Sequence, residues 1–144
     1  MNTKIIRVEE HDIDEALIRE AGDVIKAGGL VAFPTETVYG LGGDALNPES
    51  SKKIYAAKGR PSDNPLIVHI ADLESLSKVV KSIPDEAYVL AKAFWPGPLT
   101  MIFEKSDAVP FETTGGLYVA SVQMLYPDTL NQSSGIIRPI IIIS

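Results

Sequence analysis

Residues 48–70 read PESSKKIYAAKGRPSDNPLIVHI, and they predict a helix, a tight loop and a strand in succession. Asn47 followed by Pro48 is typical of a helix start, because asparagine caps the first turn and proline suits the first helical position. Gly59 ends the helix, since glycine readily adopts the left-handed conformation found at helix ends. The apolar run at residues 66–70 then predicts a buried strand.

The same alternation continues on both sides of this unit. Apolar periodicity, capping signals and breakers predict helices at residues 12–27, 73–81 and 85–94, and strands at residues 30–33, 99–103 and 117–124. Asp12 is expected to cap the first helix. A β-branched run follows at residues 136–143, interrupted by Pro139. Because helices and strands alternate, the sequence predicts an α/β fold, as a single domain over residues 1–144.

The composition is that of a globular domain, with 45% apolar and 22% charged residues. The absence of cysteine excludes disulfides, thiolate metal sites and a cysteine nucleophile, and it fits a reducing compartment. No apolar run approaches the ~20 residues of a membrane span, and the amino terminus is too short and too charged for a signal peptide. We therefore expect a cytoplasmic protein that does not associate with membranes.

The loop after the helix predicted at residues 48–58 combines two cations with neutral hydrogen-bonding side chains. Lys58 and Arg60 stand two residues apart, and Ser62 and Asn64 follow between prolines. Arginine grips phosphate with a bidentate fork and lysine supplies a mobile point charge, so the pair can neutralise charge that develops at a phosphorus atom. The net charge of −6 means that any such anion site must be local. A solvated helix end with a proline-stiffened loop would explain these residues equally well.

Two further segments carry polar groups beside apolar strands. Residues 33–40, FPTETVYG, place two hydroxyls, a carboxylate and a phenol in one loop. This suits recognition of a small polar substrate such as an amino acid, although a turn with capping residues is the alternative. His69 lies in an apolar strand on the same face as Ile67, where a histidine is more often a core residue than a ligand.

Three segments of the chain resemble, in order, the motifs of the YrdC-like threonylcarbamoyl-AMP synthase family. They are PTETVYGL at residues 34–41, KGRP at 58–61 with NPL at 64–66 and His69, and WPGPLT at 95–100. The resemblance is strong over residues 13–117 and weak over residues 118–144. It implies a twisted, open, mixed sheet with flanking helices and a positively charged cleft.

The activity implied by this resemblance is that of a nucleotidyltransferase. Such an enzyme joins L-threonine, bicarbonate and ATP into threonylcarbamoyl-AMP and releases pyrophosphate. The product feeds the threonylcarbamoyl modification (t6A) of adenosine 37 in tRNA, so the expected downstream partner is the machinery that transfers the group to tRNA.

Seven side chains would line the site by their positions in the resembling motifs. The side chains expected to contact ATP and its Mg²⁺ ion are Lys58, Arg60, Ser62 and Asn64. Lys58 and Arg60 are also expected to have a catalytic role. Those expected on L-threonine are Thr35, His69 and Tyr39. No metal site built by the protein itself is expected, because Mg²⁺ carried by ATP phosphates needs few protein ligands.

The resemblance weakens after residue 117. Gln123 lies where the family usually has arginine, and Leu125 lies where it usually has proline. Family members also usually extend further than this chain. We therefore expect C-terminal strands of the family's sheet to be missing, as a truncation or a reading-frame error in the source gene would produce.

Three other functions stay open. The chain could bind double-stranded RNA or tRNA, even weakly, without catalysis, although its acidic net charge disfavours this. It could be an inactive truncated remnant. It could also act on another substrate, as does a related domain in carbamoyltransferases that mature hydrogenases, but the acylphosphatase-like and zinc-finger segments of those proteins are missing.

Overall fold

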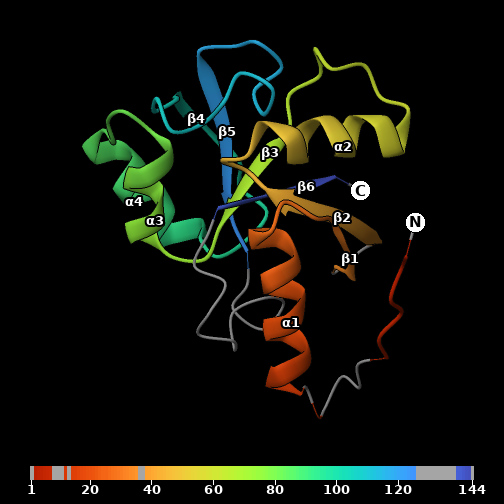
Figure 1. Ribbon diagram of the computed structural model, residues 1–144. Helices are drawn as coiled ribbons and strands as arrows, with labels where there is room; N and C mark the ends of the chain where they lie inside the picture. Colours follow the sequence, from red (N-terminus) through yellow and green to blue (C-terminus); the bar gives the residue numbers. More distant parts are fainter. Residues whose placement is uncertain (1, 8–11, 13, 36–37, 126–138, 144) are drawn as a thin grey trace.

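The computed structural model describes residues 2–7, 12, 14–35, 38–125 and 139–143, which form one mixed sheet with helices around it (Figure 1). The elements along the chain are α1 (Glu15–Lys26), β1 (Val31–Pro34), β2 (Tyr39–Asp44), α2 (Pro48–Lys58), β3 (Ile67–Ile70), α3 (Leu73–Val79), α4 (Asp85–Phe94), β4 (Met101–Glu104), β5 (Val119–Met124) and β6 (Ile140–Ile143). The strand order is β1-β2-β6-β3-β5-β4. The β3–β5 pair is parallel and the other pairs are antiparallel. The predicted α/β class with an open mixed sheet is therefore confirmed.

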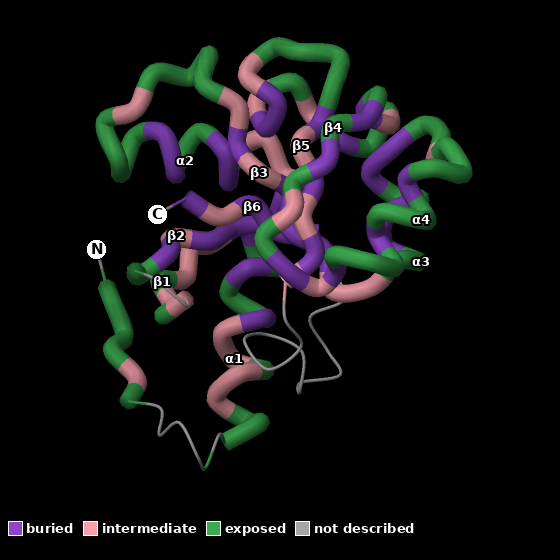
Figure 2. Tube along the Cα trace, turned by 180° about the vertical axis from the view of Figure 1, so that it is seen from behind, coloured by how far each residue is buried: buried purple, intermediate pink, exposed green. Residues whose placement is uncertain are grey.

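One face of the sheet, here called the core face, is covered by helices. Val68 on β3 lies between Ile141 on β6 and Val122 on β5, and all three side chains are fully buried. Helices α2 and α3 add Ile54 and Leu76 to the same cluster. Figure 2 shows this burial concentrated in the centre of the sheet. Figure 1 shows that α1 lies beside β1 and β2, away from the other helices.

The other face of the sheet, here called the open face, carries the alternate residues. Ile142, Ile67 and Ser121 lie in one row across β6, β3 and β5, and each is partly exposed. At the end of that row, Ile102 on edge strand β4 is 67% exposed. Because side chains alternate along a strand, this face presents the residues between those that build the core.

Strand β2 was not predicted from the sequence, because glycine is depleted in strands. Its glycines lie where neighbouring side chains close over the strand. A Cβ on Gly42 would lie 2.7 Å from Phe33 Cε1 on β1, and a Cβ on Gly40 would lie 2.7 Å from Ile142 Cγ2 on β6. The glycines therefore make room for side chains from both neighbouring strands.

The C-terminal isoleucine run forms a central strand. Residues Ile140–Ile143 pair with β2 on one side and β3 on the other, both antiparallel. Ile141 is fully buried, and Ile140 and Ile143 nearly so. Only the second half of the predicted run at residues 136–143 falls within the described strand, since residues 136–138 lie outside the described residues.

Helix boundaries follow the capping signals, with one correction. Asp14 caps α1 by accepting a hydrogen bond from the Ala16 backbone N at 2.8 Å, so the predicted cap at Asp12 is wrong. Asp14 has the same capping chemistry and lies directly before the helix. The predicted bounds of α2 and α4 are confirmed, whereas α3 ends at Val79, two residues earlier than predicted. No helix in the described part of the chain is long and apolar enough to span a membrane.

Candidate functional site

The loop at residues 59–65 joins the C-terminal end of α2 to the start of β3. Gly59 ends the helix with a left-handed φ of 59°, as its position in the sequence predicts. Lys58, Ser62 and Asn64 are exposed, and Arg60 is half-buried. Neither cation makes a hydrogen bond or an ion pair with another described residue. The loop therefore presents two positive charges that are available to a ligand.

The backbone of this loop is tied to the body of the protein. Tyr55 Oη on α2 donates a hydrogen bond to the Asn64 backbone O at 2.8 Å. The Leu66 backbone N donates to the Thr113 backbone O at 3.0 Å. A Cβ on Gly115 would lie 2.8 Å from the Asp63 backbone O, so the backbones pack in direct contact there. The loop is thus held in place while its polar side chains stay in solvent.

Thr113 connects this support to the rest of the fold. Its hydroxyl donates to the Ala45 backbone O at 2.8 Å and lies 2.8 Å from Ser51 Oγ on α2. Thr113 is fully buried. Sequence reasoning did not identify Tyr55, Thr113 or Gly115 as supports of the site, because nothing local marks a contact between residues this far apart in the chain.

Thr35 and Val38 form the turn between β1 and β2. The Thr35 backbone N and hydroxyl both donate to the Val38 backbone O, and the Val38 backbone N donates back to the Thr35 hydroxyl at 3.3 Å. Glu36 and Thr37 lie outside the described residues. The Thr35 methyl carbon lies 3.4 Å from a Cβ position on Gly40, which places Thr35 on the open face.

His69 is buried on the open face between β6 and β5. It pairs in register with Ile140 and Gln123, and the residue is only 9% exposed. Burial lowers the pKa of His69 to about 4, so the imidazole is neutral at pH 7. Its buried Nδ1 has no hydrogen-bond partner within the part of the chain that the structure describes. Because buried polar atoms are normally paired, an unpaired nitrogen here is a feature that a bound ligand would explain.

Gln123, the predicted replacement for a family arginine, lies beside His69. Its Oε1 accepts from the Thr100 hydroxyl at 3.1 Å and its Nε2 donates to the Gly97 backbone O at 3.1 Å. Trp95 holds the same segment, since its indole is buried and donates to the Leu99 backbone O at 2.7 Å. This agrees with a structural role for the WPGPLT motif. The amide of Gln123 adds no charge to the open face.

The register of the sheet shows which predicted residues come together. Leu41 pairs with Ile143, and Ile67 pairs with Ile142, so the start of β2 and the loop before β3 share one edge of the sheet. Strand β6 lies between them, so they are about 10 Å apart in the direction of the hydrogen bonds between strands. His69 lies about 10 Å further along β3, on the row that includes Asp44.

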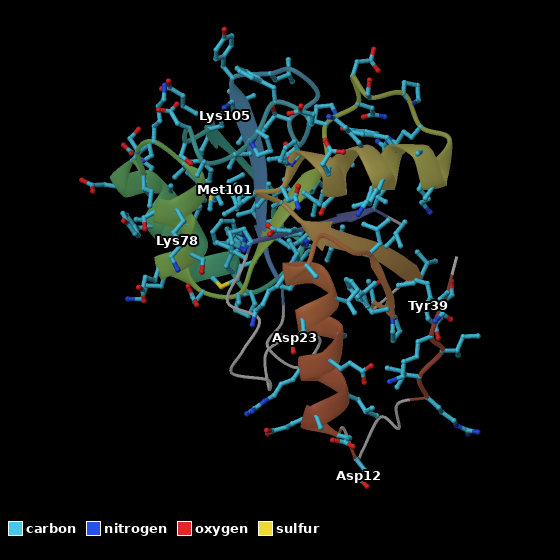
Figure 3. The ribbon with its side chains drawn as sticks, viewed as in Figure 1. Asp12, Asp23, Tyr39, Lys78, Met101 and Lys105 are labelled. Atoms are coloured by element: carbon cyan, nitrogen blue, oxygen red, sulfur yellow. The ribbon has the colours of Figure 1, made fainter. Side chains whose placement is uncertain are left out.

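Alternation separates the residues predicted to bind threonine. Thr35 and His69 lie on the open face. Tyr39 alternates with Gly40 and points to the other side, where it is 71% exposed at the outer end of β2 (Figure 3). The geometry therefore places Thr35 and His69 on one face, at different positions along it, and leaves Tyr39 at the rim. Among the described residues, no three His, Asp or Glu side chains gather closely enough to hold a metal ion.

Comparison with known families matches residues 23–129 to a family described as "Telomere recombination", which groups Sua5, YciO and YrdC. A threonylcarbamoyl-AMP synthase of Pyrococcus abyssi is 57% identical over 122 residues, which cover 85% of this chain and 36% of that protein. One of Bacillus subtilis is 48% identical over 117 residues, covering 81% of this chain and 34% of that protein. The chain thus spans about a third of the length of these relatives.

Solved structures agree with these sequence relationships. Sua5 of Pyrococcus abyssi in complex with L-threonine superposes with a TM-score of 0.86 at 51% identity, over 92% of this chain and 39% of that protein. A doubly substituted variant of the same protein superposes with a TM-score of 0.91 at 50% identity, over 99% of this chain and 42% of that one.

Proposed function

The chain belongs to the family that groups Sua5, YciO and YrdC, and on that premise we propose that it is a threonylcarbamoyl-AMP synthase. It would use L-threonine, bicarbonate and ATP, and it would release pyrophosphate. Its product would pass to the machinery that makes t6A at position 37 of tRNA. The names of the relatives and the L-threonine bound to one structural neighbour support this assignment.

The observation that carries the proposal is a pair of cations on a fixed loop, neither of them bonded through its side chain to another described residue. Lys58 and Arg60 stand on either side of Gly59, and Tyr55 and the turn around Thr113 hold the backbone between α2 and β3. In a protein of net charge −6, such a local positive site favours a polyanionic ligand. The triphosphate of ATP is the ligand of that kind in the proposed reaction.

The reaction needs positioning and charge neutralisation. The amino nitrogen of L-threonine bonds to the carbon of CO₂ supplied by bicarbonate and loses a proton, which gives a carbamate. A carbamate oxygen then bonds to the α-phosphorus of ATP, while the bond from that phosphorus to pyrophosphate breaks and its electron pair leaves with pyrophosphate. Lys58 and Arg60 would stabilise the negative charge on the phosphoryl oxygens and the leaving group.

The residues of the loop fit a metal ion that arrives with ATP. Asp63 and Asn64 are exposed and carry oxygen atoms, which suits Mg²⁺ because it takes most of its ligands from phosphate and water. When bound, Mg²⁺ would supply further neutralisation of phosphate charge. Ser62, also exposed, would donate a hydrogen bond to a phosphate oxygen from the same loop.

The open face would hold L-threonine. Thr35 and His69 both face that side, and the Nδ1 of His69, which none of the described residues pairs, would accept a hydrogen bond from the substrate. A pKa of about 4 makes His69 a weak base at pH 7, so we assign it to binding and not to proton transfer. Tyr39 lies at the rim of the sheet, so it would contact the substrate only at the outer end of the site.

The test is the release of pyrophosphate from ATP in the presence and absence of L-threonine and bicarbonate. Release should require both, and Lys58→Ala and Arg60→Ala should each lower the rate by about 100-fold. Lys78→Ala, at an exposed lysine on α3, is the matched control and should keep the parent rate. Absence of threonine-dependent release in the parent chain would overturn the proposed activity. Normal release in both loop variants would instead overturn the role given to the two cations.

A further inference from the structure

Two aromatic side chains form an exposed pair at the end of the molecule where β5 begins. The rings of Phe111 and Tyr118 meet edge to face, with centroids 5.2 Å apart. Tyr118 is 74% exposed and Phe111 is 43% exposed. This aromatic pair belongs to none of the motifs used above.

The pair is held in a fixed arrangement. The Lys105 ammonium lies 4.3 Å from the centroid of the Phe111 ring and donates to the Val109 backbone O at 2.8 Å. The Lys105 backbone N donates to the Tyr118 backbone O at 3.0 Å, and the Gly116 backbone N donates to the Phe111 backbone O at 2.9 Å. Lys105 is buried, so it supports the ring of Phe111 from within and is not offered to a ligand.

The pair adjoins the loop that carries Lys58 and Arg60. The turn between Phe111 and Tyr118 is the one that bonds to Leu66 and packs against Asp63. Ile67 and Ser121 are partners in the parallel β3–β5 pair, so the loop before β3 and the turn before β5 lie at the same end of two neighbouring strands. Neighbouring strands lie about 5 Å apart. Figure 1 shows the loop after α2 and the loop between β4 and β5 at the same end of the molecule, and Figure 3 places Lys105 there.

Resting on the proposed function, we propose that Tyr118, supported by Phe111, stacks on the adenine base of the ATP whose phosphates lie on Lys58 and Arg60. An exposed aromatic ring beside a cationic loop matches the two parts of a nucleotide, a flat base and a charged phosphate chain. Stacking needs only a free ring face of fixed orientation, and the hydrogen-bonded turn provides that orientation before a ligand binds.

The experiment compares two ligands that share phosphates but differ in the base. ATP and inorganic tripolyphosphate are titrated, each with Mg²⁺, into the parent chain and its variants by calorimetry. The informative variants are Tyr118→Ala, which removes the ring, and Tyr118→Phe, which keeps it. Tyr88→Ala is the matched control, because Tyr88 is an exposed tyrosine on α4. Lys58→Ala reports on the phosphate site.

We expect Tyr118→Ala to weaken ATP binding by about tenfold and to leave tripolyphosphate binding within about twofold. Tyr118→Phe and Tyr88→Ala should bind both ligands like the parent, and Lys58→Ala should weaken both. Unchanged ATP binding in Tyr118→Ala, or an equal loss for both ligands, would overturn the stacking role while leaving the proposed function intact. Failure of the parent chain to bind ATP would overturn both proposals.

Discussion

The phenol of Tyr55 on α2 donates its hydrogen bond to the backbone oxygen of Asn64, 2.8 Å away on the loop before β3. Burial raises the pKa of Tyr55, so the phenol remains a protonated donor at neutral pH. One hydrogen bond thus joins the helix that ends in Lys58 to the loop that carries the other predicted phosphate ligands.

Removing that hydroxyl tests whether the loop needs the support. Tyr55→Phe should lower the free energy of unfolding by about 1 kcal/mol, because the Asn64 oxygen loses its partner. It should also raise the KM for ATP, since a looser loop holds the phosphates less well. Urea denaturation and pyrophosphate release measure the two effects. Tyr88→Phe, at an exposed hydroxyl, should change neither by a comparable amount.

Two neighbouring glycines form a matched pair for the contact between the turn and the loop. Both have positive φ, 62° at Gly115 and 84° at Gly116, but only at Gly115 would a Cβ meet backbone. Gly116→Ala should cost about 1 to 2 kcal/mol for the left-handed conformation alone. Gly115→Ala should cost at least ~1 kcal/mol more, because the Asp63 backbone must move. Equal costs in chemical denaturation would show that this contact does not hold the loop.

His69 predicts a pH dependence of stability. Its folded pKa of about 4 lies below the ordinary value of 6.5, so the unfolded chain binds a proton that the folded chain refuses. The free energy of unfolding should therefore fall as the pH drops from 6.5 to 4, by up to ~1.4 kcal/mol per pH unit, and this contribution should level off below pH 4. His69→Gln should lose that part of the dependence. Parallel stability curves for parent and variant over this range would contradict the burial of a neutral imidazole.

The C-terminal strand predicts a contrast between adjacent isoleucines. Ile141 is fully buried on the core face, whereas Ile142 is partly exposed on the open face. Ile141→Ala should lower the free energy of unfolding by about 2 to 5 kcal/mol, and Ile142→Ala should cost clearly less. The denaturation midpoints of the two variants provide the measurement. Small and equal losses would mean that β6 does not contribute to the core.

Local signals in the sequence were enough for much of the scaffold. Asn47, Pro48 and Gly59 mark the ends of α2, and the apolar run before Ile70 marks β3, since caps and hydrophobic runs act through neighbouring residues. The position of the two cations on the intervening loop follows from the same boundaries. Asp12 was mistaken for the cap of α1 because two aspartates with the same capping chemistry precede that helix.

Long-range pairing explains what the sequence did not predict. From the sequence, Gly40 and Gly42 are typical of a loop, and only the contacts with Phe33 and Ile142 explain why a strand has glycine there. The final isoleucine run is a central strand only because it pairs with both β2 and β3. The Thr113 hydroxyl meets the Ala45 backbone O across 68 residues of chain. No periodicity or motif encodes such a contact.

The sequence by itself determined the α/β class, the loop with its two cations and the family to which these motifs belong. Only the tertiary structure decided that Thr35 and His69 share a face that Tyr39 does not, and that an aromatic pair adjoins the cationic loop. The physical reason is that motifs and caps depend on adjacent residues, whereas a shared face depends on strand order and register. Those are set by burying side chains from distant strands in one core.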